Sequence, residues 1–437
     1  MVSTEQKLRM KDFIEEYYEP LNNNELLKTR EERENTCRST NRIMFERDYS
    51  RILYSSSFRR LQGKMQLFGV ESDSFFRNRL THSLEVSQIA RGIVNRLREI
   101  SGKQIYEDDL YVIEAASLAH DIGNPPFGHH GERVLNKIME NNGGFEGNAQ
   151  TFRVLYRLEK KLPNKKGLNL TNRTLFSVIK YFKKYCSNKN SEKFLYDQDF
   201  NWVENTSKKA NIYPRTIDVQ IMDLADEIAY GTHDLEDALS LHLFSIDEFL
   251  YEFKKVANKK SYEFLRKEVE RAQNVAFEAK VYNSSEEYAF LFRKELVSNI
   301  VHQLILDIDV ISVDSTFKEK TGTLNEEELG FKELNDFVTS LKKVTFKSIN
   351  RSNIVQVYEK QGEKVIKGLF EAFMDKSFNT NKKLLPIEYR GEDRKRAVTD
   401  YIAGMMDSYA LNVYKDIYGE KSLDKIYNPY YFKDYCY

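Results

Sequence analysis

The sequence predicts an all-α protein, and its composition and hydrophobic spacing are the evidence. Only 19 glycines and 7 prolines occur in 437 residues, of which 41% are hydrophobic and 31% charged. Apolar residues recur at helical spacing over long runs, as in helices that bury one face. We expect a helical N-terminal extension (residues 1–40), a core (41–240) and a C-terminal helical region (241–437) that packs on the core and contributes to the substrate pocket and to an oligomer interface.

Two of the expected helices carry histidines. The first, residues 81–100, has an apolar stripe at helical spacing, and His82 lies on that stripe. The second begins after an acidic run at 107–109 and ends near Gly123, where two prolines follow. His120 and Asp121 therefore lie at a helix end.

A third helix is expected over residues 217–241. Asp226, Tyr230 and Asp234 follow one another at intervals of four, which places them on one side of an otherwise apolar helix. At 1.5 Å per residue, Tyr230 and Asp234 stand roughly 6 and 12 Å beyond Asp226 along the axis. A polar partner of about the length of a nucleoside would fit this line.

The charges and cysteines exclude several classes of protein. Lys plus Arg and Asp plus Glu are both 67, so any phosphate-binding site must be local. The three cysteines, Cys37, Cys186 and Cys436, are odd in number and far apart, which fits neither a disulfide framework nor a zinc ribbon. With no apolar run of about 18 residues and a charged N-terminus, we expect a cytoplasmic protein that does not associate with a membrane.

The stretch "HDIGNPPFGHHGE" (residues 120–132) is the densest in chemistry. A lone histidine on an apolar face is most often a hydrogen-bonded core residue, and a second His-Asp pair occurs at residues 233–234. The first pair is distinguished by its helix end and its partners, because His82, His120, Asp121 and Asp226 together offer two imidazoles and two carboxylates. Such ligands suit Mn²⁺ or Mg²⁺, and also Fe²⁺, and a divalent ion favours hydrolysis at phosphorus.

The order H…HD…D resembles the HD-domain phosphohydrolase superfamily, and the surrounding motifs are similar to those of bacterial deoxyguanosine triphosphate triphosphohydrolases. The motifs are "FERDYSRILYSSSFRRLQGKMQLF" (45–68), "RLTHSLEV" (79–86), "HDIGNPPFGHHGE", "GFEGNAQTFRVL" (144–155), "ADEIAYGTHDLEDAL" (225–239) and "DYIAGMMDSYAL" (400–411). The resemblance implies an HD-domain helical fold, one divalent ion per subunit, and hydrolysis of dGTP to deoxyguanosine and triphosphate by attack at the α-phosphorus.

Phosphate-binding residues are expected on two segments. Arg79 lies three residues before His82, about one helical turn away, and its guanidinium can reach a phosphate beside the ion. The resemblance also assigns phosphate contact to Arg79, and assigns the distal phosphates to the pair Lys180 and Tyr181. Without the resemblance, Lys180 would be interpreted as a solvated lysine.

The resemblance also suggests how the sugar is bound. It assigns Tyr230 to packing against the ribose, where it would exclude a 2′-hydroxyl, and Asp234 with Gln62 to hydrogen bonds at the 3′-hydroxyl. The alternative for all three is ordinary helix packing or capping.

His129 and Glu132 are the expected catalytic pair. They are neighbours if a helix begins after Pro126, and Glu132 can orient His129 and hold it protonated. An imidazolium there can protonate the leaving 5′-oxygen, and members of the family use this pair catalytically. His130 is interpreted as structural.

Several alternatives stay open at this point. The same ligands would serve a hydrolase of guanosine tetraphosphate or of cyclic nucleotides, and a nucleotide-binding or single-stranded-DNA-binding regulator is a further class. Lysine-rich loops at 160–166 and 183–193 could contact a DNA effector. The resemblance favours a homo-oligomer, a hexamer or a tetramer, and dGTP over other dNTPs. It leaves open which of Arg390, Arg394 and Arg396 reaches a phosphate.

Overall fold

The computed structural model describes residues 3–32, 43–66, 77–186, 192–281, 284–349, 353–390 and 393–423, and confirms the all-α class. Helices dominate, and the sheets of these residues are two antiparallel pairs of short strands. The long helices that position the site are α6 (Arg79–Ser101), α7 (Leu110–Ala119), α8 (Gly128–Ile138), α9 (Gly147–Arg153) and α12 (Ile217–Ser240).

The other α-helices frame these. Before α6 come α1 (Thr4–Tyr17), α2 (Glu19–Asn22), α3 (Glu25–Lys28), α4 (Met44–Leu53) and α5 (Ser56–Arg60). Next in the chain are α10 (Asn172–Phe176), α11 (Asp197–Ala210), α13 (Ile246–Val256), α14 (Lys259–Phe277), α15 (Ser285–Leu306) and α16 (Ser315–Thr321). The chain continues with α17 (Asn335–Ile349), α18 (Asn353–Met374), α19 (Arg394–Ala403) and α20 (Asp407–Tyr418).

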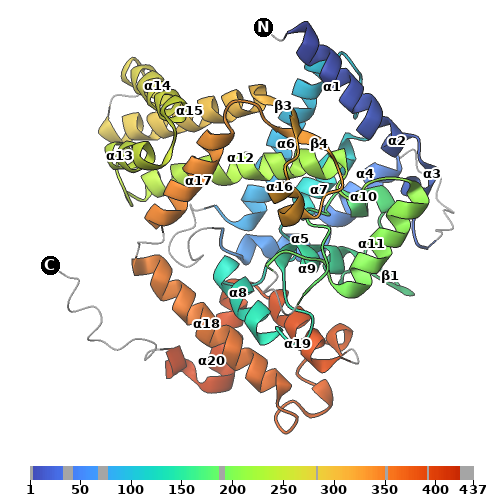
Figure 1. Ribbon diagram of the computed structural model, residues 1–437. Coiled ribbons are helices and arrows are strands. Elements are labelled where there is room, and N and C mark those ends of the chain that lie inside the picture. Colours follow the sequence, from blue (N-terminus) through green and yellow to red (C-terminus); the bar gives the residue numbers. More distant parts are fainter. Residues whose placement is uncertain are drawn as a thin grey trace.

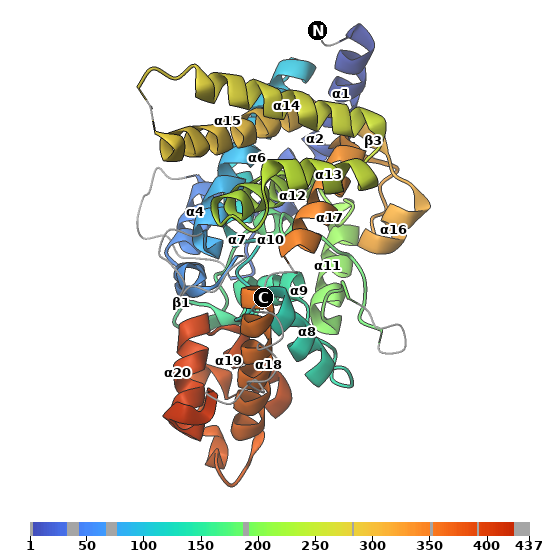
Figure 2. The same ribbon diagram turned by 90° about the vertical axis from the view of Figure 1, so that its left-hand side faces the viewer.

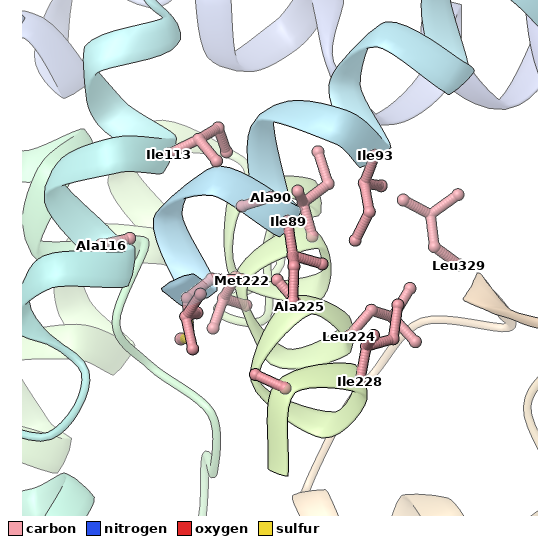
Figure 3. Packing of buried hydrophobic residues seen from close by; sticks show 14 of the residues in the cluster. Ile89, Ala90, Ile93, Ile113, Ala116, Met222, Leu224, Ala225, Ile228 and Leu329 are labelled. Carbon is pink, nitrogen blue, oxygen red and sulfur yellow. The ribbon is translucent and has the colours of Figure 1, made fainter. Parts of the chain in front are cut away.

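The main core is built where α6, α7 and α12 cross. Apolar side chains from the three helices interdigitate there, and Leu329 of strand β4 (Glu327–Phe331) packs against the same group (Figure 3). The labelled members are Ile89, Ala90, Ile93, Ile113, Ala116, Met222, Leu224, Ala225 and Ile228. α12 is buried over most of its length, so polar groups that it carries inward need partners from α6 and α7.

The N-terminal helices belong to the same packing unit. Met10, Phe13 and Ile14 of α1 are buried in the main core, as is Leu27 of α3. Helices α13, α14, α15 and α17 also bury their apolar faces in it, and α13, α14 and α15 lie at one end of the molecule (Figure 2). The division at residues 40 and 240 stays a prediction; in the packing, residues on both sides of each boundary share one core.

A second core forms at the opposite end of the molecule, from α8, α18, α19 and α20 (Figures 1 and 2). Phe127, which precedes α8, packs into this core beside Gly362 of α18. A Cβ at residue 362 would lie 2.5 Å from Cγ of Phe127, so only glycine admits the ring at this distance. The segment "NPPFGHHG" therefore links the two cores.

The short strands were not expected from the sequence. Strand β3 (Ile308–Ser312) pairs with β4 in the region expected to be helical, and β1 (Lys160–Leu162) pairs with β2 (Lys165–Lys166) where we expected a surface loop. β-branched residues at 308, 310 and 311 favour extended backbone, and Glu328 of β4 is buried against Arg215.

Of the three cysteines, Cys186 is exposed, whereas Cys37 and Cys436 lie outside the described residues.

A buried guanidinium ties the helices of the main core together. Arg173 of α10 is 1% exposed and donates to both carboxylate oxygens of Asp218, at 2.9 and 3.0 Å, and to Asp109. Tyr18 and Tyr106 donate to the same two carboxylates. The group joins α10 to the first turn of α12 and to the start of α7.

Replacing Arg173 should therefore be costly. The Arg173→Met variant leaves two buried carboxylates without their cation, and we expect it to lose about 3–5 kcal/mol of unfolding free energy. Chemical denaturation followed by circular dichroism measures the loss. As a control, Arg266→Met removes an arginine that is half exposed and pairs with neighbours on its own helix, so a change below about 1 kcal/mol is expected. Equal losses in the two variants would contradict this account of Arg173.

Candidate metal centre and active site

Four side chains from three elements converge at the predicted metal site. Nε2 of His82, on α6, lies 3.1 Å from Oδ1 of Asp226, on α12. Nε2 of His120, at the end of α7, lies 3.4 Å from the same oxygen and 3.6 Å from Oδ1 of Asp121. Asp226 thus faces both histidines. The expected helices and the helix-end position of His120 are confirmed.

The orientation of His120 fits a metal ligand. Its Nδ1 lies 2.6 Å from the carbonyl oxygen of Ser117, so Nε2 is the nitrogen directed at the carboxylates. That Nε2 is buried and faces the carboxylate oxygens of Asp226 and Asp121, at 3.4 and 3.6 Å. A buried imidazole nitrogen that faces carboxylates and is held by a backbone bond on its other side has the orientation of a metal ligand. The donor set of two imidazoles and two carboxylates suits Mn²⁺, Mg²⁺ or Fe²⁺.

Helix α9 holds the backbone at His120 in place. The Thr151 hydroxyl donates to the His120 carbonyl and accepts from the Gly123 amide, both at 2.9 Å. A Cβ at Gly123 would lie 2.1 Å from the backbone nitrogen of Thr151, so glycine is required for this close approach. The Gly123 that was predicted to end the helix also lets α9 support the metal ligand.

Cations neutralise the carboxylates of the site. Arg79 donates to Asp121, which also accepts from Asn124, and Lys180 lies 2.8 Å from Asp226 and from Asp223. Burial alone would raise the pKa of Asp121, but the Arg79 guanidinium and the two histidines hold it below its usual value. For Asp226, burial is likewise outweighed, first by Lys180 and then by His120, and its pKa lies well below the ordinary value. Both carboxylates are ionised, as metal ligands must be.

A second cluster beside the site is occupied by an arginine. His82, Glu85 and His233 also lie close enough together to hold an ion. However, Arg77 donates to both oxygens of Glu85, at 2.9 and 3.0 Å, and Nδ1 of His233 lies 3.0 Å from Glu85. The guanidinium already supplies the positive charge there. The second His-Asp pair therefore lies outside the set that converges on Asp226.

The expected catalytic pair lies on α8. Nδ1 of His129 is 3.1 Å from Oε2 of Glu132, while Oε1 of Glu132 accepts from the Gly147 amide at 3.0 Å. Burial would raise the pKa of Glu132, but His129 and Lys193 lower it to about 2, so Glu132 stays ionised. His129 is half exposed, whereas His130 is mostly buried between Glu359 and Glu363 of α18. These contacts fit the structural part predicted for His130.

One cavity of about 210 Å³ joins three of the four predicted metal ligands to the predicted catalytic pair. Its lining comprises His120, Asp121, Asn124, His129, Glu132, Gly147, Asn148, Lys180, Tyr181, Lys193 and Asp226, whereas His82 contacts Asp226 but does not belong to the lining. A larger cavity of about 610 Å³ adjoins it and shares His129, Glu132 and Lys193. Apart from His82, the residues predicted to bind metal and distal phosphates and to catalyse the reaction thus surround one space.

The residues predicted to bind the sugar do not line this cavity. Tyr230 and Asp234 lie one and two turns beyond Asp226 on α12, as predicted, while Gln62 is exposed on the 3₁₀ turn Leu61–Gly63. Burial, and then Asp237, raise the pKa of Asp234 well above its ordinary value, so it can hold a proton and donate a hydrogen bond. Sugar binding by Tyr230, Asp234 and Gln62 stays a prediction. Phosphate binding by Arg79 also stays a prediction, since Arg79 here pairs with Asp121.

The sequence analysis did not identify Lys193, which lines the cavity, or Asp223 and Arg215, which hold Lys180 in place. Lys193 lies 2.8 Å from Glu146 and 3.4 Å from Glu132, with its ammonium over the Tyr181 ring at 5.6 Å. Asp223 links Lys180 to Arg215, each at 2.8 Å. Of these residues, only Asp223 could have been found from the sequence, because it lies about one helical turn before Asp226.

The three C-terminal arginines bond to backbone carbonyls. Arg390 donates to residues 383 and 385, Arg394 to residues 373, 375 and 379, and Arg396 to residues 142 and 144. Arg390 and Arg394 thus hold nearby chain segments, whereas Arg396 ties α19 to the loop that follows α8.

The loop between Asp121 and α8 is clamped by a lysine and an aspartate. Lys64, 2% exposed, donates to the carbonyls of Asn124 and Ala403. The carboxylate of Asp407 accepts from the amides of Met65 and Phe127, at 2.9 and 3.0 Å. Phe127 has a left-handed backbone (φ 62°), which is unfavourable for a bulky residue and persists only where the surroundings impose it.

Comparison with known proteins gives the family. Residues 79–231 match the HD domain, and residues 332–416 match the phosphohydrolase-associated domain. Deoxyguanosinetriphosphate triphosphohydrolase-like protein 2 of Vibrio cholerae is 48% identical over 395 residues, which cover 89% of this chain and 92% of that protein. The chain belongs to the deoxyguanosinetriphosphate triphosphohydrolase-like family.

Other members of this triphosphohydrolase-like family are similar over the same extent. Those of Shewanella pealeana and Shewanella baltica are each 34% identical, with alignments that cover 88% of this chain and 94% of each relative. As a member of this family the chain is an HD-type phosphohydrolase. Among the described residues, no helix is both long and apolar enough to cross a membrane.

Removing one ligand should abolish tight metal binding. We expect the wild-type protein, stripped of metal, to take up one Mn²⁺ per chain, and His120→Ala to bind it at least about 100-fold more weakly. Titration calorimetry with Mn²⁺ measures the affinity. His302→Ala, which removes an exposed histidine of α15, is the matched control and should bind like wild type. Unchanged affinity in His120→Ala would place the metal elsewhere.

Lys64 should make stability depend on pH. Burial lowers its pKa to about 7, against about 10.4 in an unfolded chain. Between these values the unfolded chain binds a proton that the folded chain does not, so folding stability rises with pH in that window. Melting temperatures at pH 6.5, 8 and 9.5 should therefore rise in wild type relative to Lys64→Met. Parallel profiles for the two proteins would show that Lys64 titrates normally.

Proposed function

We propose that the protein hydrolyses dGTP to deoxyguanosine and inorganic triphosphate, using one Mn²⁺ or Mg²⁺ ion held by His82, His120, Asp121 and Asp226. The observation that carries the proposal is the cavity in which Nε2 of His120 faces two ionised carboxylates, and whose lining also includes His129, Lys180 and Lys193. The names of the relatives support dGTP as the substrate.

The parts of the reaction follow from this arrangement. The bound ion supplies charge neutralisation at the phosphoryl oxygens and lowers the pKa of water. Water attacks the α-phosphorus and releases one proton to solvent, and the bond from phosphorus to the 5′-oxygen breaks. His129 delivers the proton to that oxygen, and Glu132 keeps its ring in place. The products are an uncharged nucleoside and a triphosphate.

Cationic and phenolic groups hold the triphosphate chain. Lys180 and Tyr181 line the cavity beside Asp226, and Lys193 lies between this cavity and the larger one. We assign the distal phosphates to Lys180, Tyr181 and Lys193, and a phosphate nearer the ion to Arg79. Tyr230 packs on the sugar, and Asp234 with Gln62 bonds the 3′-hydroxyl.

The remaining assignments come from the resemblance to the family and from the composition of the chain. We propose a homo-oligomer, hexameric or tetrameric, in the cytoplasm, with single-stranded DNA as an effector. Separating the oligomer by size and titrating a labelled oligonucleotide would test these two properties.

The function is tested by product analysis. Metal-loaded protein is incubated with each dNTP and with GTP, and the products are separated by ion exchange, with Asp121→Ala as the inactive control. We expect deoxyguanosine and triphosphate from dGTP, and lower kcat/KM for the other substrates. Pyrophosphate or monophosphate products would contradict attack at the α-phosphorus, and turnover of guanosine tetraphosphate or a cyclic nucleotide instead would favour those alternatives.

The neighbouring histidines of α8 provide a matched pair for the same assay. His129→Ala should lower kcat by about 10²- to 10⁴-fold with a small change in KM, because it removes the proton donor. His130→Ala should leave kcat nearly unchanged, since His130 contacts α18 and does not line the cavity. Equal losses in both variants would point to a disturbed helix and not to proton transfer.

A further inference from the structure

A second cavity lies away from the metal, between the N-terminal helices and the start of α12. It measures about 600 Å³, within the usual range of small-molecule sites. Tyr17 of α1, Pro20 of α2, Tyr213 and Leu324 contribute to its mainly apolar wall, and Thr216 lies at the N-cap of α12. All of its lining residues belong to the described part of the chain.

Thr216 is the polar group that marks this cavity as a binding site. Thr216 belongs to the lining of the cavity and is 4% exposed, and its hydroxyl has no hydrogen-bond partner. Although Thr216 occupies the N-cap position of a long helix, it makes no side-chain capping bond. A buried hydroxyl without a partner is destabilising unless a ligand or water satisfies it.

The charges around the cavity disfavour an anionic ligand. Its two basic residues already have acidic partners: Lys208 pairs with Glu204, and Arg215 with Asp223 and Glu328. Glu16 adds a negative charge at the rim. Within α12, Asp218 occupies the first turn and is bonded to Arg173, so the positive end of the helix dipole is already compensated. An uncharged ligand fits better than a nucleotide.

The aromatic side chains that line the cavity indicate which class of ligand it binds. Tyr213 is 49% exposed beside the cavity, and Tyr17 and Phe182 complete an aromatic lining on which a flat heterocycle can stack. Thr216 offers one donor and one acceptor, which match the hydrogen-bonding edge of a base or a sugar hydroxyl.

The cavity is connected to the metal centre through one short segment. Phe182 lines the second cavity, while its neighbours Lys180 and Tyr181 line the first. Arg215, also in the second lining, donates to the Lys180 carbonyl at 3.0 Å and to Asp223 at 2.8 Å. Asp223 in turn shares the Lys180 ammonium with Asp226.

We propose that this cavity is a second binding site, for an uncharged nucleoside, whose occupancy alters the position of Lys180 at the metal centre. The choice of nucleoside rests on the proposed function, because that reaction releases one. Binding there acts on turnover only as far as the ligand prefers one position of the Lys180–Phe182 segment over another.

Deoxyguanosine is the probe, and metal-loaded full-length protein is titrated with it in a calorimeter. We expect two classes of site in wild type. Thr216→Val keeps the side-chain shape and removes the hydroxyl, so it should weaken one class about five- to tenfold. Tyr213→Ala should weaken the same class. Asp234→Ala should weaken only the other, at the active site.

Matched controls exclude general effects of the substitutions. Thr345→Val removes another buried hydroxyl without a partner, on α17, and Tyr54→Ala removes another exposed tyrosine. Neither residue lines the cavity, and neither change should alter deoxyguanosine binding. Melting temperatures of all variants show whether each is folded.

Two results would overturn the proposal. One is a single class of site that is lost in Asp234→Ala and unaffected by Thr216→Val and Tyr213→Ala; the other is no deoxyguanosine binding at all. Binding is measured without turnover, so a second site in a protein that hydrolyses no dNTP would refute the proposed function and leave this site standing. Where turnover occurs, deoxyguanosine should lower kcat at saturating dGTP, and Thr216→Val should weaken this effect, whereas rebinding of the product at the active site would be unaffected by Thr216→Val.

Discussion

The arrangement of the whole site depends on the carboxylate of Asp226. It lies on the most deeply buried long helix, within 3.4 Å of both histidines and 2.8 Å from the Lys180 ammonium. A carboxylate in that position is tolerable only when cations or a metal compensate its burial. The crossing of α6, α7 and α12 brings these partners to one point, and the apolar contacts of Figure 3 hold the crossing in place.

The catalytic helix is positioned by a different set of forces. His129 and Glu132 belong to α8, whose apolar face packs on α18 to α20 in the second core. The loop that joins this helix to the metal ligands is fixed at both of its ends: Lys64 holds the Asn124 carbonyl, and Asp407 holds the Phe127 amide. The distance between the proposed metal ligands and His129 is therefore set in part by Lys64 and Asp407, so "DYIAGMMDSYAL" supports motifs that lie far from it in sequence.

Local sequence patterns were sufficient to predict the helices that carry the site and the pairing of two of its side chains. Periodicity located α6, α7 and α12, the prolines located the start of α8, and the i, i+3 spacing paired His129 with Glu132. The convergence of His82, His120 and Asp226 also followed from the order of motifs. What could not be predicted depends on long-range packing, which leaves no periodic signal: Lys193 enters the cavity from a loop, and Arg215 joins β4 to α12. The strands β3 and β4 were missed for the same reason, since their pairing is decided by the helices they cover.

The charges of the site show how binding steps are coupled. Three carboxylates, Asp121, Asp223 and Asp226, are paired with three cations, Arg79, Lys180 and Arg215. Arg79 and Lys180 are also the residues proposed to bind phosphate. A divalent ion held by Asp121 and Asp226 would compete with Arg79 and Lys180 for the same oxygens and so leave their N–H groups available to an anionic substrate. Because the ion and the triphosphate carry opposite charges, each should favour the binding of the other.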